Sequence, residues 1–463
     1  MAKSENERDL LLGSGRKEAR EAPNSSITCR IDGYFTSMLL LTVSFFFSFA
    51  PFSAIQNLES SLNAQDNLGA NALATLYLVY TAGCLLAPAV VRSLSPKYTM
   101  IISSIFVCAF VVAHVKPTWF TLMPASASVG LWCAFMWAAQ GVYITQCALG
   151  YSRTSNGNVD VPTALSLFNG IFWGLYNVNQ IMGNVVSSIV LRNGHSQQTL
   201  FVLFALFLGM ASLASGLLCL LTPIHEINDS QDGESRPKAS RKKEKESPPE
   251  IDDTASTEDM IMSTFLLIKD PQMLLLTPWF LFTGLAFGFL CSDFSKDLVR
   301  ESLGIHHIGL VMCTFGGADA VACLFIGKIA PVVGRLNLMI FSYVVYSVIF
   351  LFMMVWQVQT SAYFTLYGIS ILYGVADAVF ITQIYNVIGE TFQDRMEAAF
   401  SLFRMWNSLG MSIAFFGSVS LHWFTKLVGL LIAINLTLLG YYFVDDTVAR
   451  KGFEKGAIRK CVS

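Results

Sequence analysis

The sequence predicts an all-α, polytopic helical membrane protein with 12 transmembrane helices in two six-helix pseudo-repeats. Apolar runs of roughly 20 residues recur between Tyr34 and Val444, short polar breaks separate them, and motifs of the first half return in the second. A helix needs about 20 apolar residues to cross a hydrocarbon core of ~30 Å. Runs of this length exceed the 9–11 residues of a membrane barrel strand, so the spans are expected to be helical.

Composition agrees with a membrane protein. The chain is 54% hydrophobic and 13% charged, whereas a soluble domain is about 25% charged. The lipid bilayer is therefore the expected environment, and the formal net charge of −2 gives no indication of a nucleic-acid partner. The N-terminus lacks the apolar core of a cleaved signal peptide. The sequence contains no nucleotide-binding, zinc-protease or hydrolase motif, so we expect no catalytic residues, no metal and no cofactor.

The helical spans follow one another with few irregularities. They are expected at 34–54, 71–91, 98–115, 119–144, 165–191, 199–221, 273–291, 306–330, 336–356, 363–388, 399–421 and 424–444. These spans divide the chain into an N-terminal tail (1–33), a first half (34–222), a linker (223–263), a second half (264–444) and a C-terminal tail (445–463). Charged, Pro- and Ser-rich sequence in the linker predicts disorder.

Basic residues predict the orientation. Of the 30 Lys and Arg residues, 24 lie in or beside the two tails and the loops on their side of the membrane, and 5 lie on the opposite side. Cytosolic segments carry an excess of Lys and Arg. Both termini and the linker are therefore expected in the cytosol.

The two halves repeat short sequences in the same order. Asn67-Leu68-Gly69 and Ser302-Leu303-Gly304 open spans 2 and 8, and Ser166-Leu167-Phe168 and Ser401-Leu402-Phe403 open spans 5 and 11. Spans 4 and 10 begin with Phe120-Thr121-Leu122 and Phe364-Thr365-Leu366, each followed by a glycine, Gly130 or Gly374. Two six-helix halves in the same orientation imply a pseudo-two-fold axis along the membrane normal. That arrangement is the major facilitator architecture.

A loop motif supports this architecture. Residues 327–335 resemble the major facilitator motif glycine–x–aliphatic–small–Asp–x–x–Gly–Arg, with Pro331 in the place of the Asp. The first-half counterpart, 89–97, has Ser93 at the acidic position. The missing carboxylates indicate either an unusual transporter or a protein that keeps the fold without the transport cycle.

Several stretches, in order along the chain, resemble the uncoordinated-93-like family. They are Gln56 to Glu59, Trp137 to Thr145, Phe168 to Trp173, Gly183-Asn184, Ala318 to Ala320, Gly374 to Ala378, Thr382-Gln383 and Arg404-x-Trp406. Members of this family are described as regulators of two-pore potassium channels, as trafficking chaperones of Toll-like receptors, or as orphan transporter-like proteins. The resemblance implies a twelve-helix membrane protein and leaves these roles open.

Ionisable residues inside spans are candidates for function because each costs about 2.5–3.5 kcal/mol at mid-bilayer. Asp319 lies in span 8, Asp377 and Gln383 in span 10, and Arg404 in span 11. They form a candidate intramembrane polar network that binds a substrate, couples protons or holds a partner-competent conformation. The alternative is a structural ion pair or hydrogen-bonded carboxyl, and we expect a pair of Asp377 or Asp319 with Arg404. Pairing of Arg404 with Glu397, or extension of its side chain to the membrane surface, is equally open.

Amide side chains suggest a cavity between the halves. The candidate lining residues are Gln140, Asn169, Asn177, Gln180 and Asn184, with Asn179 on the same span. Interhelical hydrogen bonds are the alternative. Glu59 and Asp293 follow spans 1 and 7, where we expect solvated positions at the cavity mouth.

The N-terminal tail holds Glu7, Leu11 and Leu12 in the spacing of an acidic-dileucine sorting signal. The signal would direct the protein to an endolysosomal or vacuolar membrane, with the plasma membrane as the alternative.

Two functions remain. The family resemblance and the altered loop motif favour a regulatory protein that modulates or traffics a membrane partner such as a potassium channel or receptor. The two-half fold and its intramembrane polar residues also fit a secondary transporter of a small solute.

Overall fold

The computed structural model describes residues 33–155, 159, 161–192, 194, 196–222, 264, 266–356, 362–392 and 395–462, and these residues contain no β-strand. The first half comprises α2 (Gly33–Leu62), η1 (Gln65–Asn67), α3 (Leu68–Leu94), α4 (Pro96–Ala113), α5 (Trp119–Thr154), α6 (Val161–Leu191) and α7 (Gln197–Cys219). The second half comprises α10 (Pro271–Phe289), the π-helix η2 (Leu290–Arg300), α11 (Glu301–Leu303), α12 (His306–Val333), α13 (Arg335–Val355), α14 (Tyr363–Thr391), α15 (Met396–Ser420) and α16 (Trp423–Val462). The predicted all-α membrane fold is confirmed.

Within the described part of the chain, 10 helical segments are long and apolar enough to cross a membrane. The two other long helices, α6 and α15, are the ones that carry the intramembrane amides and Arg404. Both occupy predicted spans, so the count of 12 spans remains a prediction. Helix α16 continues to Val462, beyond the predicted end of the last span.

The turns before α4 and α13 occupy equivalent places in the two halves. Gly334 precedes α13 with φ +87°, a left-handed conformation that glycine adopts without steric cost. Ser95 precedes α4 with φ +65°. The loop motif thus keeps a similar backbone turn in both halves, although neither copy carries the acidic residue of the major facilitator pattern.

The glycines of the sequence repeat lie at equivalent helix crossings. A Cβ on Gly130 of α5 would lie 2.2 Å from the Leu76 carbonyl oxygen of α3. A Cβ on Gly374 of α14 would lie 2.4 Å from the Phe315 carbonyl oxygen of α12. Each glycine therefore lets two backbones approach closely, as small residues do between membrane helices. The repeat in the sequence corresponds to a repeat in packing.

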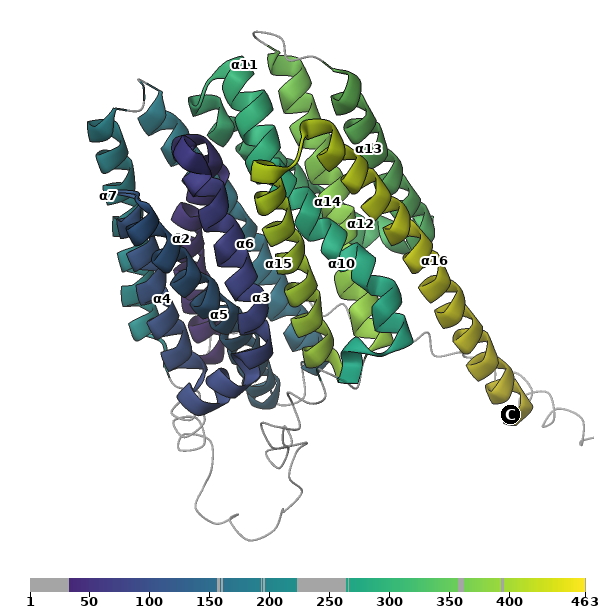
Figure 1. The fold of residues 1–463 in the computed structure, drawn as a ribbon. Helices are drawn as coiled ribbons and strands as arrows, with labels where there is room; N and C mark the ends of the chain where they lie inside the picture. The colour runs from purple at the N-terminus through teal and green to yellow at the C-terminus, as the bar shows by residue number, and fades with distance from the viewer. Residues whose placement is uncertain are drawn as a thin grey trace, which may run out of the picture.

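The two halves meet along two helix pairs. Helix α3 packs against α15, and α6 packs against α12, so each pair joins a purple-to-blue element to a green or yellow one (Figure 1). The short α11 lies at one end of the bundle, and the C-terminal end of α16 extends at the other (Figure 1). We call these the α11 end and the opposite end.

Candidate functional site

Glu59 lies close to the C-terminal end of α2, at the α11 end, and is fully buried. Its Oε2 atom accepts a hydrogen bond from His114 Nε2 at 2.6 Å, and its Oε1 atom accepts one from Asn63 Nδ2 at 2.9 Å. His114 Nδ1 donates to the Phe110 carbonyl oxygen at 2.7 Å. Because both ring nitrogens face acceptors, the imidazole carries two protons. Burial lowers the pKa of His114, but the Glu59 carboxylate and the hydrogen bonds outweigh burial and hold this pKa above its ordinary value.

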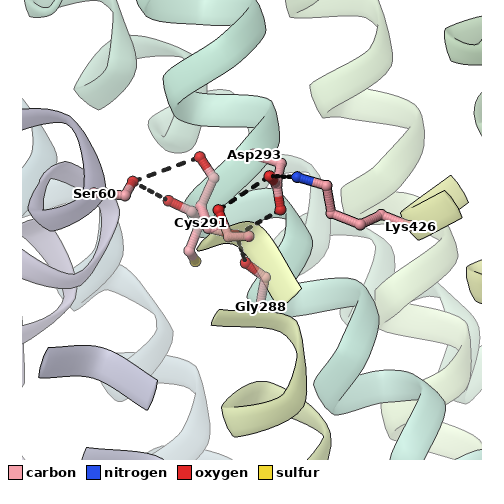
Figure 2. Close-up of polar contacts among 7 residues, drawn as sticks. Ser60, Gly288, Cys291, Asp293 and Lys426 are labelled. Atoms are coloured by element: carbon pink, nitrogen blue, oxygen red, sulfur yellow. Dashed lines mark hydrogen bonds and ion pairs between the residues drawn. The ribbon is translucent and has the colours of Figure 1, made fainter. Parts of the chain in front are cut away.

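Asp293 belongs to the π-helix η2 and is also buried, with 1% of its surface exposed. Lys426 of α16 forms an ion pair with its Oδ1 atom, as Figure 2 shows. The Ser418 hydroxyl donates to the same oxygen at 3.0 Å, and the Ser292 hydroxyl donates to Oδ2 at 3.0 Å. The sequence suggested solvated positions for Glu59 and Asp293, but the structure buries both. Each carboxylate has a basic partner from a distant part of the sequence: His114 for Glu59 and Lys426 for Asp293. The sequence pattern did not predict either pair.

Contacts between α2 and η2 join the halves at the α11 end. Cys291 Sγ donates to Asn57 Oδ1 at 3.2 Å, and Arg300 Nη1 donates to the Ser61 carbonyl oxygen at 2.9 Å. The Ser60 hydroxyl faces the Cys291 carbonyl oxygen at 3.4 Å (Figure 2). We call these five residues the seal. The π-helical turn presents the Cys291 and Arg300 side chains to α2 while its own backbone continues α10.

A second set of contacts joins α3 to α15 along much of their length. Side-chain hydroxyl groups make these contacts, mostly to carbonyl oxygens of the facing helix. The pairs are Ser412 with the Ala74 carbonyl oxygen at 2.9 Å, Thr81 with Ser408 at 2.9 Å, and Ser401 with the Cys84 carbonyl oxygen at 3.2 Å. Neutral hydrogen bonds thus hold these two helices together.

Two of the amides on α6 bind α2 within the first half. Asn179 Oδ1 accepts from the Ser53 hydroxyl at 3.0 Å, and Asn184 Oδ1 accepts from Asn57 Nδ2 at 3.1 Å. These two side chains are buried and make the interhelical hydrogen bonds that were the alternative to cavity lining. Asn57 also accepts from Cys291, so it links this pair to the seal.

The remaining amides differ in exposure. Asn169 is exposed and donates to the Leu165 carbonyl oxygen of its own helix at 3.0 Å. Asn177 and Gln180 are partly exposed, and Gln140 on α5 is buried. Cavity lining by Asn169, Asn177, Gln180 and Gln140 remains a prediction.

The intramembrane carboxyl groups lie within the second half. Asp377 Oδ1 accepts from the Tyr346 hydroxyl at 3.2 Å. Asp319 Oδ1 accepts from Cys323 Sγ at 3.7 Å, and Thr382 Oγ1 donates to the same sulfur at 3.8 Å. The two carboxyl groups interact electrostatically with each other. No described basic side chain forms an ion pair with either one.

Arg404 does not join these carboxyl groups. Its guanidinium carbon lies 4.7 Å from the ring centroid of Trp137, on α5 of the first half, and the guanidinium also interacts with Tyr80 of α3. The pair of Arg404 with Asp377 or Asp319 that the sequence favoured is therefore not formed. Arg404 points across the interface between the halves, and the acids point into helices of their own half.

Gln383 completes the set of predicted intramembrane residues. It is fully buried on α14, and among the described residues neither its amide nitrogen nor its amide oxygen has a hydrogen-bond partner. A buried unpaired amide costs about 1–3 kcal/mol. The structure gives no contact that joins Gln383 to Arg404 or to the two carboxyl groups.

Comparison with known proteins identifies the family. A family model described as "Ion channel regulatory protein UNC-93" matches residues 61–442. The chain belongs to the UNC-93 family. It is 29% identical to protein unc-93 homolog A of Bos taurus over 455 residues, which cover 91% of this chain and 95% of the relative. The human homolog A is 29% identical over 90% of this chain and 94% of its own. UNC93-like protein 3 of Arabidopsis thaliana is 27% identical over 92% of this chain and 89% of its own.

Solved structures agree with the fold. The nucleoside transporter NupG matches with a TM-score of 0.59 and 16% identity, covering 89% of this chain and 98% of NupG. A mutant of the same transporter matches with a TM-score of 0.60. The major facilitator fold is thereby confirmed, and at this level of identity the likeness concerns the fold alone. The family description supports the regulatory interpretation over the transporter interpretation.

Some of the stretches that resembled the UNC-93 family lie at or beside the interface between the halves. Asn57 and Asn184 form the α2–α6 pair beside the seal, while Trp137 and Arg404 meet across the middle of the bundle. Sequence reasoning missed the basic partners His114 and Lys426. His114 follows α4, and Lys426 is a single basic residue near the start of α16, so neither stood in a recognisable motif.

Proposed function

We propose that this chain regulates an ion channel, most specifically a potassium channel, as a partner in the same membrane. The observation that carries the proposal is the match of the UNC-93 family model to residues 61–442. A relative in Caenorhabditis elegans, 27% identical over 94% of this chain and 62% of its own length, has a name that proposes potassium channel regulation. The proposal assigns no catalytic reaction to the chain.

The arrangement of charges supports regulation. If the intramembrane acids coupled solute movement to a change in how the halves are arranged, we would expect them to contact both halves. The described contacts of Asp319 and Asp377 stay within the second half, with Cys323 and Tyr346. A regulator needs the fold as a binding surface and needs no such coupling.

Reciprocal purification and current recording test the proposal. The tagged full chain should copurify a potassium channel subunit at near-equal stoichiometry from its native membrane, identified by mass spectrometry. Coexpression of that channel with the chain should change its current density or gating, and channel expressed with the tag alone is the control. Absence of any channel subunit, together with saturable uptake of a solute by proteoliposomes of the pure chain, would overturn regulation and establish transport.

We propose that both termini and the linker face the cytosol, because 24 of the 30 basic residues lie on that side. The α11 end then faces away from the cytosol. A protease added to sealed right-side-out vesicles should leave residues 223–263 intact and should cleave them after the vesicles are opened. Cleavage from outside the sealed vesicles would reverse the orientation.

We further propose sorting to an endolysosomal or vacuolar membrane through Glu7, Leu11 and Leu12, which lie outside the described residues. The double change Leu11→Ala with Leu12→Ala should move the protein toward the plasma membrane, as surface biotinylation would measure. Leu10→Ala is the matched control, since Leu10 adjoins the pattern but is not part of it. An unchanged distribution of the double variant would remove the sorting role.

A further inference from the structure

Arg404 is a cation at the interface of the halves without an acidic partner. Among the described side chains, no carboxylate lies within ion-pair distance of it. Tyr80 of α3 is a neutral side chain that interacts with it, so the guanidinium keeps N–H donors for a further acceptor. The face of Trp137 offsets part of the charge by a cation–π interaction. The remaining donors form a planar fork that fits a carboxylate.

Glu397 is on the same helix, and its side chain is outside the described set. It precedes Arg404 by two helical turns, a rise of about 10.5 Å. Residues that pair along a helix are three or four positions apart. Glu397 does not have the spacing of an adjacent-turn pair with Arg404, and a variant of it is part of the experiment below.

Aromatic rings from both halves form a connected cluster that includes Trp137, the ring beside the guanidinium. Trp173 of α6 stacks on Trp137 with ring centroids 5.7 Å apart and an interplanar angle of 6°. Tyr385 of α14 lies 6.0 Å from Trp173, and Tyr176 lies 5.1 Å from Trp137. These rings offer flat apolar walls beside a cationic fork.

Part of this cluster of Arg404 and aromatic rings is exposed. Arg404, Trp173 and Tyr385 are partly exposed. One turn from Trp137 toward the opposite end, Gly141 is exposed and has no atom within 4 Å of a Cβ built on it. One turn from Trp173 in the same direction, Asn169 is exposed. At the α11 end, by contrast, the seal joins α2 to η2.

From these observations we infer that Arg404 and the rings of Trp137, Trp173, Tyr385 and Tyr80 form a binding site for a small aromatic carboxylate, entered from the opposite end. The carboxylate pairs with the free N–H groups of Arg404, and the ring of the ligand packs against the aromatic walls. Because the site takes residues from both halves, its ligand would hold the halves in this arrangement. The inference goes beyond the proposed channel regulation and does not depend on it.

Equilibrium binding of radiolabelled benzoate to the purified full chain in lipid nanodiscs tests the site. Benzoate should bind saturably, and unlabelled indole-3-acetate should compete. Benzamide and benzylamine, which keep the ring but lack the anionic group, should compete at least tenfold more weakly. Absence of saturable benzoate binding up to about 10 mM, an affinity too weak for a built site, would overturn the inference. Equal competition by benzamide would do the same.

Variants tie the binding to Arg404. Arg404→Gln should lower benzoate affinity at least tenfold, and it should fold because it removes an uncompensated intramembrane charge. Arg404→Lys keeps the charge but loses the planar fork, so it should lose affinity by a smaller factor. Arg192→Gln, at an exposed position after α6, is the matched control and should bind as the natural chain does. Retention of affinity within twofold by Arg404→Gln would overturn the assignment.

Glu397→Gln tests whether Glu397 pairs with Arg404 in place of a ligand. If Arg404 is free of a counter-ion, this change should leave benzoate affinity within twofold. A tenfold gain in affinity would show that Glu397 occupies the guanidinium and would overturn the site as described. Channel currents recorded with Arg404→Gln show separately whether regulation needs the ligand.

Discussion

Charged side chains are treated differently at the α11 end and in the middle of the bundle. At the α11 end, Glu59 faces His114 and Asp293 faces Lys426, and hydroxyl or amide donors reach the same carboxylates. In the middle, Arg404 lies among aromatic rings, and Asp377 has a neutral tyrosine as its partner.

The difference separates structural from functional charge. A buried carboxylate with a basic partner and further donors is compensated, and removing one partner leaves a strongly destabilised structure. An intramembrane cation that pairs with no described acid is a candidate for binding a ligand or partner. The α11 end is thus built to hold the fold, whereas the middle retains groups that can respond to a ligand or a partner.

The largest effect is expected from Glu59→Gln. It removes the carboxylate that faces the buried His114, and breaking a buried pair in this way costs about 3–5 kcal/mol. Equilibrium unfolding of the full chain in mixed micelles measures the loss. The double change with His114→Gln should recover part of it. Asp66→Asn, at an exposed acidic position of the same end, is the control and should stay within about 0.5 kcal/mol. A similarly small effect of Glu59→Gln would show that the paired charges at the α11 end do not stabilise the fold.

A smaller, pH-dependent effect follows from His114. Its pKa is higher in the folded chain than its ordinary value, so the pair stabilises the fold fully at pH values below the ordinary pKa. This contribution is lost as the pH rises through the raised pKa. The stability difference between the natural chain and His114→Gln should therefore shrink as the pH rises above about 6.5, the ordinary pKa of histidine. Unfolding measured across that range checks it, and a difference that grows with pH would contradict the charged pair.

The smallest effect concerns Asp377 and Arg404. Asp377→Asn keeps an oxygen that accepts from Tyr346, so we expect a loss of about 1 kcal/mol or less. Because Asp377 and Arg404 share no described contact, the double change with Arg404→Gln should be additive within about 0.5 kcal/mol. The sequence suggested rescue instead. Rescue by more than about 1 kcal/mol in the same unfolding assay would show that the two groups are coupled after all.

The sequence alone determined the architecture. Apolar runs of spanning length located every long helix that the structure describes, and the repeated triplets located the equivalent glycines, Gly130 and Gly374. These properties are local, since a helix satisfies its backbone within its own segment and a lipid-facing side chain need only be apolar. The sequence also singled out Arg404 and the two intramembrane acids as unusual, because any charge inside an apolar run stands out.

Only the tertiary structure decided the partners. Glu59 meets His114, which follows α4. Asp293 of η2 meets Lys426 of α16, far along the sequence, and Arg404 meets Trp137 rather than a described acid. Which side chains meet depends on the rotation and crossing point of each helix, and these follow from close packing at residues such as Gly130. Hydropathy does not indicate how a membrane helix is rotated about its axis, because most of its faces are apolar. The side-chain pairs between helices therefore could not be predicted from the sequence alone.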